Sequence, residues 1–343
     1  MLLVPAMVED SLLSVSGLCV DYAADDGILP VVSGVSFNIG RGRTMALVGE
    51  SGCGKSVTCY SVLRLIQKPG RIVRGRIVLR PVRAHEIDIT SLPENSEQMF
   101  AVRGGLVSII FQEPMSALSP VHTIGDQVAE ALLLHRDISK PEARRQCVEI
   151  LRKVGIPNPE QRYDQYPHQM SGGIRQRVVI AMALVVRPEL LIADEPTTAL
   201  DVTLQAQILD LIRDLQREIA CSVLLVTHDL GVVAQMADDV AVMYLGRIVE
   251  QGPVRQILRH PRHPYTRGLI QSIPSADTGQ RLAAIPGSVP SFSEIPAGCH
   301  YHPRCPHSSA GLCDVGSPPP LTSLMAGHEV ACLRADELAE VNP

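Results

Sequence analysis

The chain has 343 residues, with 31 Lys and Arg against 36 Asp and Glu and a formal net charge of -5. This length is enough for about two domains with buried cores, and 45% hydrophobic with 20% charged residues exclude a wholly disordered chain. The mildly acidic balance and an aromatic content of 3%, without Trp, argue against a protein that wraps nucleic acid or stacks single strands.

No segment of the sequence is apolar enough to cross a membrane by itself. The longest purely apolar run, residues 178–186, is well short of the roughly 20 residues that a spanning helix needs. The N-terminal residues lack the basic region of a signal peptide. We therefore expect a cytoplasmic chain whose cysteines are reduced.

Short apolar runs and helical stretches alternate along the first 250 residues. Residues 31–39 alternate as a strand does, and residues 45–49 form a buried strand before a glycine-rich turn and a helix. Two further runs, 190–194 and 222–228, are apolar on both faces. This order predicts an α/β core with a parallel sheet covered by helices. The clearest helical stretches are residues 174–186 and 204–219.

Two other regions differ from this core. Residues from about 115 to 175 are polar and helix-prone, with an amphipathic stretch at 140–154, which predicts an inserted helical subdomain. After Gly252 the chain holds 13 of its 26 prolines, a density that prevents long helices and central strands. The tail is therefore either a loop-rich module held by its cysteines or a disordered extension.

A phosphate-binding pattern follows the strand at 45–49. Gly49-Glu-Ser-Gly-Cys-Gly-Lys-Ser56 fits G-x-x-x-x-G-K-[ST] and lies between a strand and a helix, as that pattern requires. Its glycines let backbone N–H groups curl around phosphates. Lys55 would reach the β and γ phosphates, and Ser56 would ligate Mg²⁺. A chance glycine-rich turn is the alternative for this pattern taken alone.

Two acidic residues end the apolar run at 190–194. Asp194 can hold Mg²⁺ through water, and Glu195 can take a proton from an attacking water. A strand can also end in a solvated acidic loop without any function. The phosphate-binding pattern earlier in the sequence favours a functional role for this pair over a solvated loop.

A third segment, Ser171-Gly-Gly-Ile-Arg-Gln176, opens the helix at 174–186. Ser171 suits an N-cap position, and the two glycines after it allow a ligand to approach the first turn of the helix. A capped helix start is the alternative for this segment alone. Three polar residues complete the pattern: Gln112, Asp201 and His228.

In order and spacing, these motifs resemble the nucleotide-binding subunits of ABC transporters. The resemblance covers essentially the whole chain and implies an enzyme that couples ATP hydrolysis to solute translocation. It implies an α/β fold with a P-loop ABC ATPase core, an antiparallel β subdomain, an inserted helical subdomain and a Cys-rich C-terminal extension. The expected segments are 1–114 and 178–252 for the core, 115–177 for the helical subdomain and 253–343 for the extension.

The resemblance also assigns roles to single residues. Glu195, His228 and Gln112 would be catalytic, with Glu195 as the general base. Mg²⁺ would be held by Ser56, Gln112 and Asp194. The residues expected to contact ATP are Tyr22 (stacked on adenine), Gly49, Glu50, Ser51, Gly52, Cys53, Gly54, Lys55, Ser56, Gln112, Asp194, Ser171, Gly172, Gly173, Gln176 and Asp201.

Four further segments resemble importers of dipeptides, oligopeptides or nickel: residues 166–173, 263–266, 285–290 and 302–306. This closer resemblance implies peptide as the cargo, with nickel as the alternative. The implied partners are a paralogous ATPase subunit in a heterodimer, two transmembrane permease subunits and, indirectly, an extracytoplasmic solute-binding protein. The chain would lie at the cytoplasmic face of the bacterial inner (plasma) membrane.

Two other functions compete with this one. A soluble ABC ATPase acting on nucleic acid or the ribosome usually carries a coiled-coil insertion or a second cassette, and this sequence has neither. A nucleotide sensor without turnover would require the loss of Glu195 or His228, and both are present. We therefore expect no nucleic-acid partner.

Four cysteines crowd the tail: Cys299, Cys305, Cys313 and Cys332. A reducing cytoplasm disfavours disulfides, which leaves packed free thiols or a metal centre. A tail with few apolar partners would need an internal cross-link, such as a bound metal, to adopt an ordered structure. The spacing lacks the tight C-x2-C of structural zinc sites. The family resemblance implies a [4Fe–4S] cluster, with zinc as the alternative.

Overall fold

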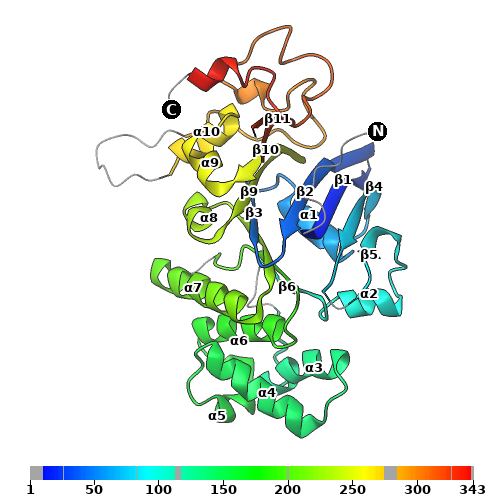
Figure 1. Cartoon of the computed structure of the whole chain (residues 1–343), viewed down its shortest axis with the longest axis vertical. Helices are drawn as coiled ribbons and strands as arrows, with labels where there is room; N and C mark the ends of the chain where they lie inside the picture. Colours follow the sequence, from blue (N-terminus) through cyan, green and yellow to red (C-terminus); the bar gives the residue numbers. More distant parts are fainter. Residues whose placement is uncertain are drawn as a thin grey trace.

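The computed structural model describes residues 11–25, 27–82, 84–112, 117–198, 201–273, 284–325 and 327–340 (Figure 1). The first ten residues, where the sequence predicts no signal peptide, lie outside this part of the chain. The strands are β1 (Ser11–Ala24), β2 (Gly27–Gly40), β3 (Thr44–Val48), β4 (Gly70–Leu79), β5 (Ile87–Asp88), β6 (Val107–Ile110), β7 (Leu190–Asp194), β8 (Ser222–Thr227), β9 (Asp239–Tyr244), β10 (Arg247–Pro253), β11 (Thr322–Met325) and β12 (His328–Val330). The helices are α1 (Lys55–Val62), α2 (Glu97–Val102), α3 (Ile124–His135), α4 (Lys140–Lys153), α5 (Pro159–Tyr163), α6 (Gly172–Leu184), α7 (Val202–Ile219), α8 (Leu230–Met236), α9 (Val254–Arg259) and α10 (Pro264–Gln271). Among these described helices, none combines the length and the hydropathy needed to cross a membrane.

The larger sheet has eight strands in the order β11-β12-β10-β9-β3-β8-β7-β6. Strands β9, β3, β8, β7 and β6 run parallel. Every residue of β3, β7 and β8 is buried, because α7 and α8 lie on one side of the sheet and α1 lies on the other (Figure 1). The α/β core predicted from the apolar runs is therefore confirmed.

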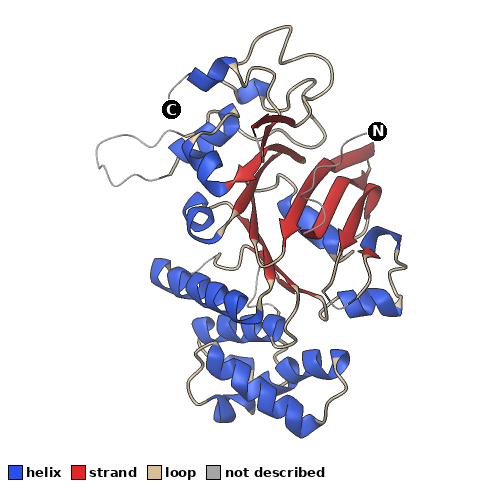
Figure 2. Cartoon of the chain, in the orientation of Figure 1, coloured by secondary structure: helices blue, strands red, loops and turns tan. Residues whose placement is uncertain are grey.

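A second sheet, of four antiparallel strands in the order β2-β1-β4-β5, stands beside the first (Figure 2). Residues 31–39, predicted as a strand, lie in β2 of this sheet. Apolar side chains of β1 and β2, such as Leu13 and Phe37, share one buried cluster with Leu47 of β3 and Ile192 of β7. Cys59 and Val62 of α1 belong to the same cluster. The helix that follows the phosphate-binding pattern is therefore wedged between the two sheets.

Helices α3 to α6 gather below the larger sheet (Figure 1). Ser139 begins α4 by accepting a hydrogen bond from the Glu142 N–H, and Thr123 begins α3 in the same way from Asp126. Their buried faces share a cluster with α7 and with β7 and β8. The helical character predicted for this part of the chain is present. The boundary predicted between residues 114 and 115 falls in 113–116, outside the described residues.

The C-terminal region, residues 253–340, is loop-rich as predicted, yet two of its strands join the larger sheet. Strand β12 pairs with β10, and β11 pairs with β12 at the sheet edge. Tyr265 and Tyr301 pack with Tyr244 of β9, with ring centroids 4.7 to 5.3 Å apart. The expectation of few apolar partners is wrong, because this buried aromatic cluster and the sheet edge supply them.

Candidate functional site

The phosphate-binding pattern forms the loop between β3 and α1. Gly49 has φ 156°, and a Cβ atom there would lie 2.1 Å from the carbonyl oxygen of Met243, so only glycine fits. Gly54, with φ 99°, is the N-cap of α1. The Lys55 Nζ donates to the carbonyl oxygens of Gly49 at 2.8 Å and Glu50 at 3.0 Å. The ammonium group therefore lies inside the curl of the loop, at the start of a helix, where a phosphate would be held.

Two of the three residues predicted to hold Mg²⁺, Ser56 and Asp194, meet next to this loop, whereas Gln112 contacts Glu195. Ser56 Oγ donates to Asp194 Oδ1 at 3.1 Å. Asp194 is fully buried at the end of β7, and its Oδ2 accepts no hydrogen bond from the part of the chain that the structure describes. Burial raises the pKa of Asp194, while the bond from Ser56 lowers it. A hydroxyl beside a buried, unsatisfied carboxylate oxygen fits a divalent cation, which prefers oxygen ligands.

Glu195 lies directly after β7 and gathers three polar side chains. Thr198 Oγ1 donates to its Oε2 at 2.9 Å, and Gln112 Nε2 donates to the same oxygen at 3.4 Å. His228 Nδ1 lies 3.3 Å from Oε1. Burial opposes ionisation of Glu195, but the bonds from Thr198 and His228 outweigh it and lower its pKa. The carboxylate is thus ionised at neutral pH, as a proton acceptor must be.

The structure therefore brings together residues that lie far apart in the sequence. Strands β7 and β8 are parallel neighbours, so Glu195 and His228 emerge at the same edge of the sheet. Thr198 is a member of this group that the sequence analysis missed. Its position three residues after Glu195, in the turn before α7, is the signal that could have found it.

The segment 171–176 is divided between an exposed helix start and one buried residue beside Glu195. Ser171 is at the N-cap of α6, but its side chain makes no capping hydrogen bond, and Ser171 and Gly172 are exposed. Gln176 is buried and donates to the carbonyl oxygen of Pro196 at 2.6 Å, beside Glu195. Helix α6 lies in the lower half of the molecule and α1 lies higher, beside the upper part of the sheet (Figure 1). The start of α6 therefore does not cover the phosphate-binding loop of its own chain.

Two other predicted site residues make local contacts. Tyr22 of β1 packs against Gly70 of β4, where a Cβ atom would lie 2.5 Å from the Tyr22 ring. Asp201 accepts a hydrogen bond from the Leu204 N–H at 2.9 Å and so begins α7. Packing and capping account for these contacts, and the nucleotide roles of both residues remain predictions.

The predicted metal centre in the tail is wrong. Cys299, Cys305, Cys313 and Cys332 line one small hollow, but all four are free cysteines. Among the residues that the structure describes, no three Cys, His, Asp or Glu side chains are grouped as a metal ion requires. Burial raises the pKa of Cys305 and of Cys332 to about 11, so both side chains of the described structure are neutral thiols near pH 7. The packing of Tyr244, Tyr265 and Tyr301 supplies a buried core for the tail without a metal cross-link.

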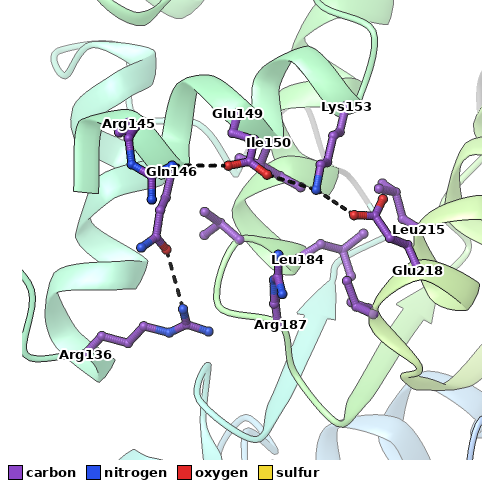
Figure 3. Close-up of a pocket in the computed structure, with 12 residues that line it drawn as sticks. Arg136, Arg145, Gln146, Glu149, Ile150, Lys153, Leu184, Arg187, Leu215 and Glu218 are labelled. Atoms are coloured by element: carbon purple, nitrogen blue, oxygen red, sulfur yellow. Dashed lines mark hydrogen bonds and ion pairs between the residues drawn. The ribbon is translucent and has the colours of Figure 1, made fainter. Parts of the chain in front are cut away.

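A polar hollow also lies between α4 and the ends of α6 and α7 (Figure 3). Several of its charges are paired with one another: Lys153 lies 3.1 Å from Glu149 and 2.6 Å from Glu218, and Arg145 lies 3.8 Å from Glu149. The residues predicted to bind ATP do not line it. The sheet edge around Lys55 and Glu195 therefore stays the candidate nucleotide site predicted from the sequence.

Comparison with protein families gives two matches. Residues 32–198 match the ABC transporter family, and residues 249–313 match the C-terminal region of oligopeptide and dipeptide transporters. The chain is 47% identical to the dipeptide transport ATP-binding protein DppD of Bacillus subtilis over 96% of this chain and 97% of the relative. It is also 47% identical to the oligopeptide transport ATP-binding protein AppD of the same organism, over 95% and 98%.

Solved structures agree with this match. The ATP-binding cassette MJ0796, in a dimeric post-hydrolysis state bound to ADP and Pi, is 25% identical with a TM-score of 0.62, over 71% of this chain and 99% of that one. The cbiO1 protein of Clostridium perfringens, part of an ABC transporter complex, is 28% identical with a TM-score of 0.60, over 72% and 90%. Both likenesses cover about seven tenths of this chain.

Proposed function

The chain belongs to the ABC transporter family, as an ATP-hydrolysing subunit, and we propose that it energises the import of dipeptides or oligopeptides. The observation that carries the proposal is the sheet edge where Ser56 and Asp194 adjoin Glu195 and its partner His228. This is the set of groups that phosphoryl transfer to water needs: a phosphate cradle, a cation site and a base.

Each side chain has a role that its geometry allows. Lys55 would exchange its two carbonyl partners for phosphate oxygens, since its ammonium already lies within the loop. Ser56 and Asp194 would hold Mg²⁺, which when bound neutralises phosphate charge. Glu195 would take the proton of the attacking water, while His228 and Thr198 fix the direction of its carboxylate. Gln112, which donates a hydrogen bond to Glu195, would respond through this contact when nucleotide occupies the site.

A second subunit would complete each site. Ser171 and the glycines after it are exposed at a helix start and do not cover the phosphate-binding loop of their own chain. A helix N-terminus favours negative charge, so it suits the γ-phosphate of a nucleotide bound to another subunit. The dimeric state of the similar cassette MJ0796 supports this arrangement. We propose a paralogous ATPase subunit as the partner, with Tyr22 stacked on the adenine and Asp201 near the subunit contact.

The cargo and the remaining partners follow from the relatives. DppD is a dipeptide transport protein and AppD an oligopeptide transport protein, and residues 249–313 match the corresponding C-terminal region. We therefore propose peptide rather than nickel as the cargo. Two membrane permease subunits and a solute-binding protein outside the membrane would select it, with this chain at the cytoplasmic face of the bacterial inner membrane.

Reconstitution tests this proposal. The assembled transporter in proteoliposomes should hydrolyse ATP faster when loaded with the solute-binding protein and a peptide, and should accumulate labelled peptide. A variant with Glu195→Gln should abolish uptake while the assembly stays intact. Uptake of a nickel chelate but not of peptide would contradict the proposed cargo, and peptide uptake without ATP hydrolysis would contradict the proposed role.

A further inference from the structure

The C-terminal region reaches the phosphate-binding loop through the side chain of Arg304. This residue ends a short 3₁₀ helix (His302–Arg304) and lies 254 residues after Glu50 of the loop. Arg304 Nη1 donates to Glu50 Oε2 at 2.7 Å, and Nη2 donates to Oε1 at 3.0 Å. Two parallel bonds between a guanidinium and a carboxylate are stronger and more directional than a single ion pair.

Arg304 is itself firmly held. Its side chain is 4% exposed, against 28% for that of Glu50. Its Nε donates to the carbonyl oxygen of Pro286 at 2.9 Å, and its guanidinium carbon lies 5.8 Å from the ring centroid of Tyr244. The guanidinium is therefore part of the packed C-terminal region, and Glu50 is the member of the pair that it positions.

A second contact holds the backbone of the same loop residue. The Glu50 N–H donates to the hydroxyl oxygen of Tyr265 at 2.9 Å. Tyr265 belongs to α10 and is fully buried beside Tyr244 and Tyr301. The backbone N–H and the carboxylate of Glu50 are thus both attached to residues that follow position 253.

The charge of Glu50 gives the contact a consequence for ATP. Its carbonyl oxygen is 3.0 Å from the Lys55 Nζ, so its backbone borders the place proposed for phosphate. A carboxylate without a partner here would repel the triphosphate, because like charges raise each other's free energy in a partly buried site. The Arg304 guanidinium cancels that charge.

We propose that Arg304 is a positioning residue for ATP binding, which holds the phosphate-binding loop through Glu50 and removes a negative charge from beside the triphosphate. The inference rests on the proposed ATP site and adds a dependence of that site on the C-terminal region. Arg304 acts through Glu50 and not on the nucleotide, so its loss should weaken ATP affinity while Glu195 keeps its partners.

The affinity of the full-length chain for Mg-ATP, measured by titration calorimetry, tests the proposal. Arg304→Gln should weaken binding about tenfold, which corresponds to about 1.4 kcal/mol. Glu50→Gln should have a smaller effect, and the double variant should return toward Glu50→Gln, because no carboxylate is then left unpaired. Arg304→Lys keeps the charge but loses the paired geometry, so its affinity should lie between those of the parent and Arg304→Gln.

Arg334→Gln is the matched control. Arg334 is also a tail arginine, but it donates to the carbonyl oxygen of His307 and pairs with Glu337, away from the loop. Its substitution should leave ATP affinity unchanged. If Arg304→Gln does not fold, the affinity of Arg304→Lys for Mg-ATP tests the proposal in its place. The inference would be overturned if the folded Arg304 variant bound Mg-ATP with the parental affinity. It would also be overturned if the double variant bound Mg-ATP as weakly as Arg304→Gln does. Failure of the parent chain to bind ATP would overturn the proposed function instead.

Discussion

The ATP site and the C-terminal region share one sheet but are encoded differently in the sequence. Asp194 ends the buried strand β7, Glu195 follows it, and Lys55 begins the helix after the loop that follows β3. Short windows of sequence therefore place all three at the same edge. The order of the C-terminal region depends on Tyr244, Tyr265 and Tyr301, which come from three separate segments. Motifs with a local backbone requirement can therefore be found before the fold is known, and packing between distant segments cannot.

The four tail cysteines illustrate the same difference. Their crowding in the tail suggests ligands, but a metal site requires side chains at fixed distances from one point, and closeness along the sequence does not give those distances. In the structure they line one hollow as free cysteines. Four substitutions, taken in order of decreasing effect, test this contrast between the two regions.

Replacing Glu195 with Gln should affect chemistry alone. The turnover of the assembled transporter should fall by about 10²–10⁴-fold, because the amide cannot accept the proton of the attacking water. ATP affinity, measured separately, should stay near the parental value. An unchanged turnover would show that the proton is accepted elsewhere and would remove Glu195 from the site.

Replacing Tyr301 with Ala should affect stability instead. Its ring is 2% exposed, and the loss of such a buried aromatic side chain costs about 3–5 kcal/mol. Denaturant unfolding of the full chain measures this cost. Tyr166→Ala is the control, since Tyr166 is 39% exposed and its loss should cost little. Equal costs for the two variants would mean that the aromatic cluster does not order the tail.

The acid stability of the chain should depend on His263. Burial lowers its pKa to about 4, although Glu250 opposes the shift, so the folded state prefers the neutral ring. The unfolded state takes up a proton below about pH 6.5, and stability should therefore fall between about pH 6.5 and 4, by up to about 3 kcal/mol. Comparing unfolding of the parent and of His263→Asn across this range isolates the contribution. His260→Asn is the exposed control and should leave the slope unchanged.

Replacing all four tail cysteines with Ala should have the smallest effect. Each of these half-buried thiols contributes as a small apolar group, so we expect a loss of roughly 1 kcal/mol or less per residue and no change in iron or zinc content. Elemental analysis of anaerobically purified chain, with its melting temperature, provides the measurement. Stoichiometric metal in the parent, lost from the variant, would restore the metal hypothesis.

Much of the cassette was predictable from residues alone. The run at 190–194 coincides with β7, and the run at 222–228 contains β8, because strands buried on both faces leave an unbroken apolar pattern. Strand β12 was not predicted, because its three residues join the larger sheet by pairing with β10, about 80 residues earlier. The Arg304–Glu50 contact was missed for the same reason, since its partners lie 254 residues apart.

We propose that the loop at Lys55 and the helix start at Ser171 serve two different nucleotides. A variant with Ser171→Arg tests it by two readings on one protein: ATP affinity of the chain alone, and turnover after assembly with the paralogous subunit and the permeases. The account predicts unchanged affinity of the chain alone and a loss of turnover of about tenfold or more in the assembly, because the exposed helix start can no longer approach the partner's nucleotide. Weakened affinity in the chain alone, or full turnover in the assembly, would contradict it.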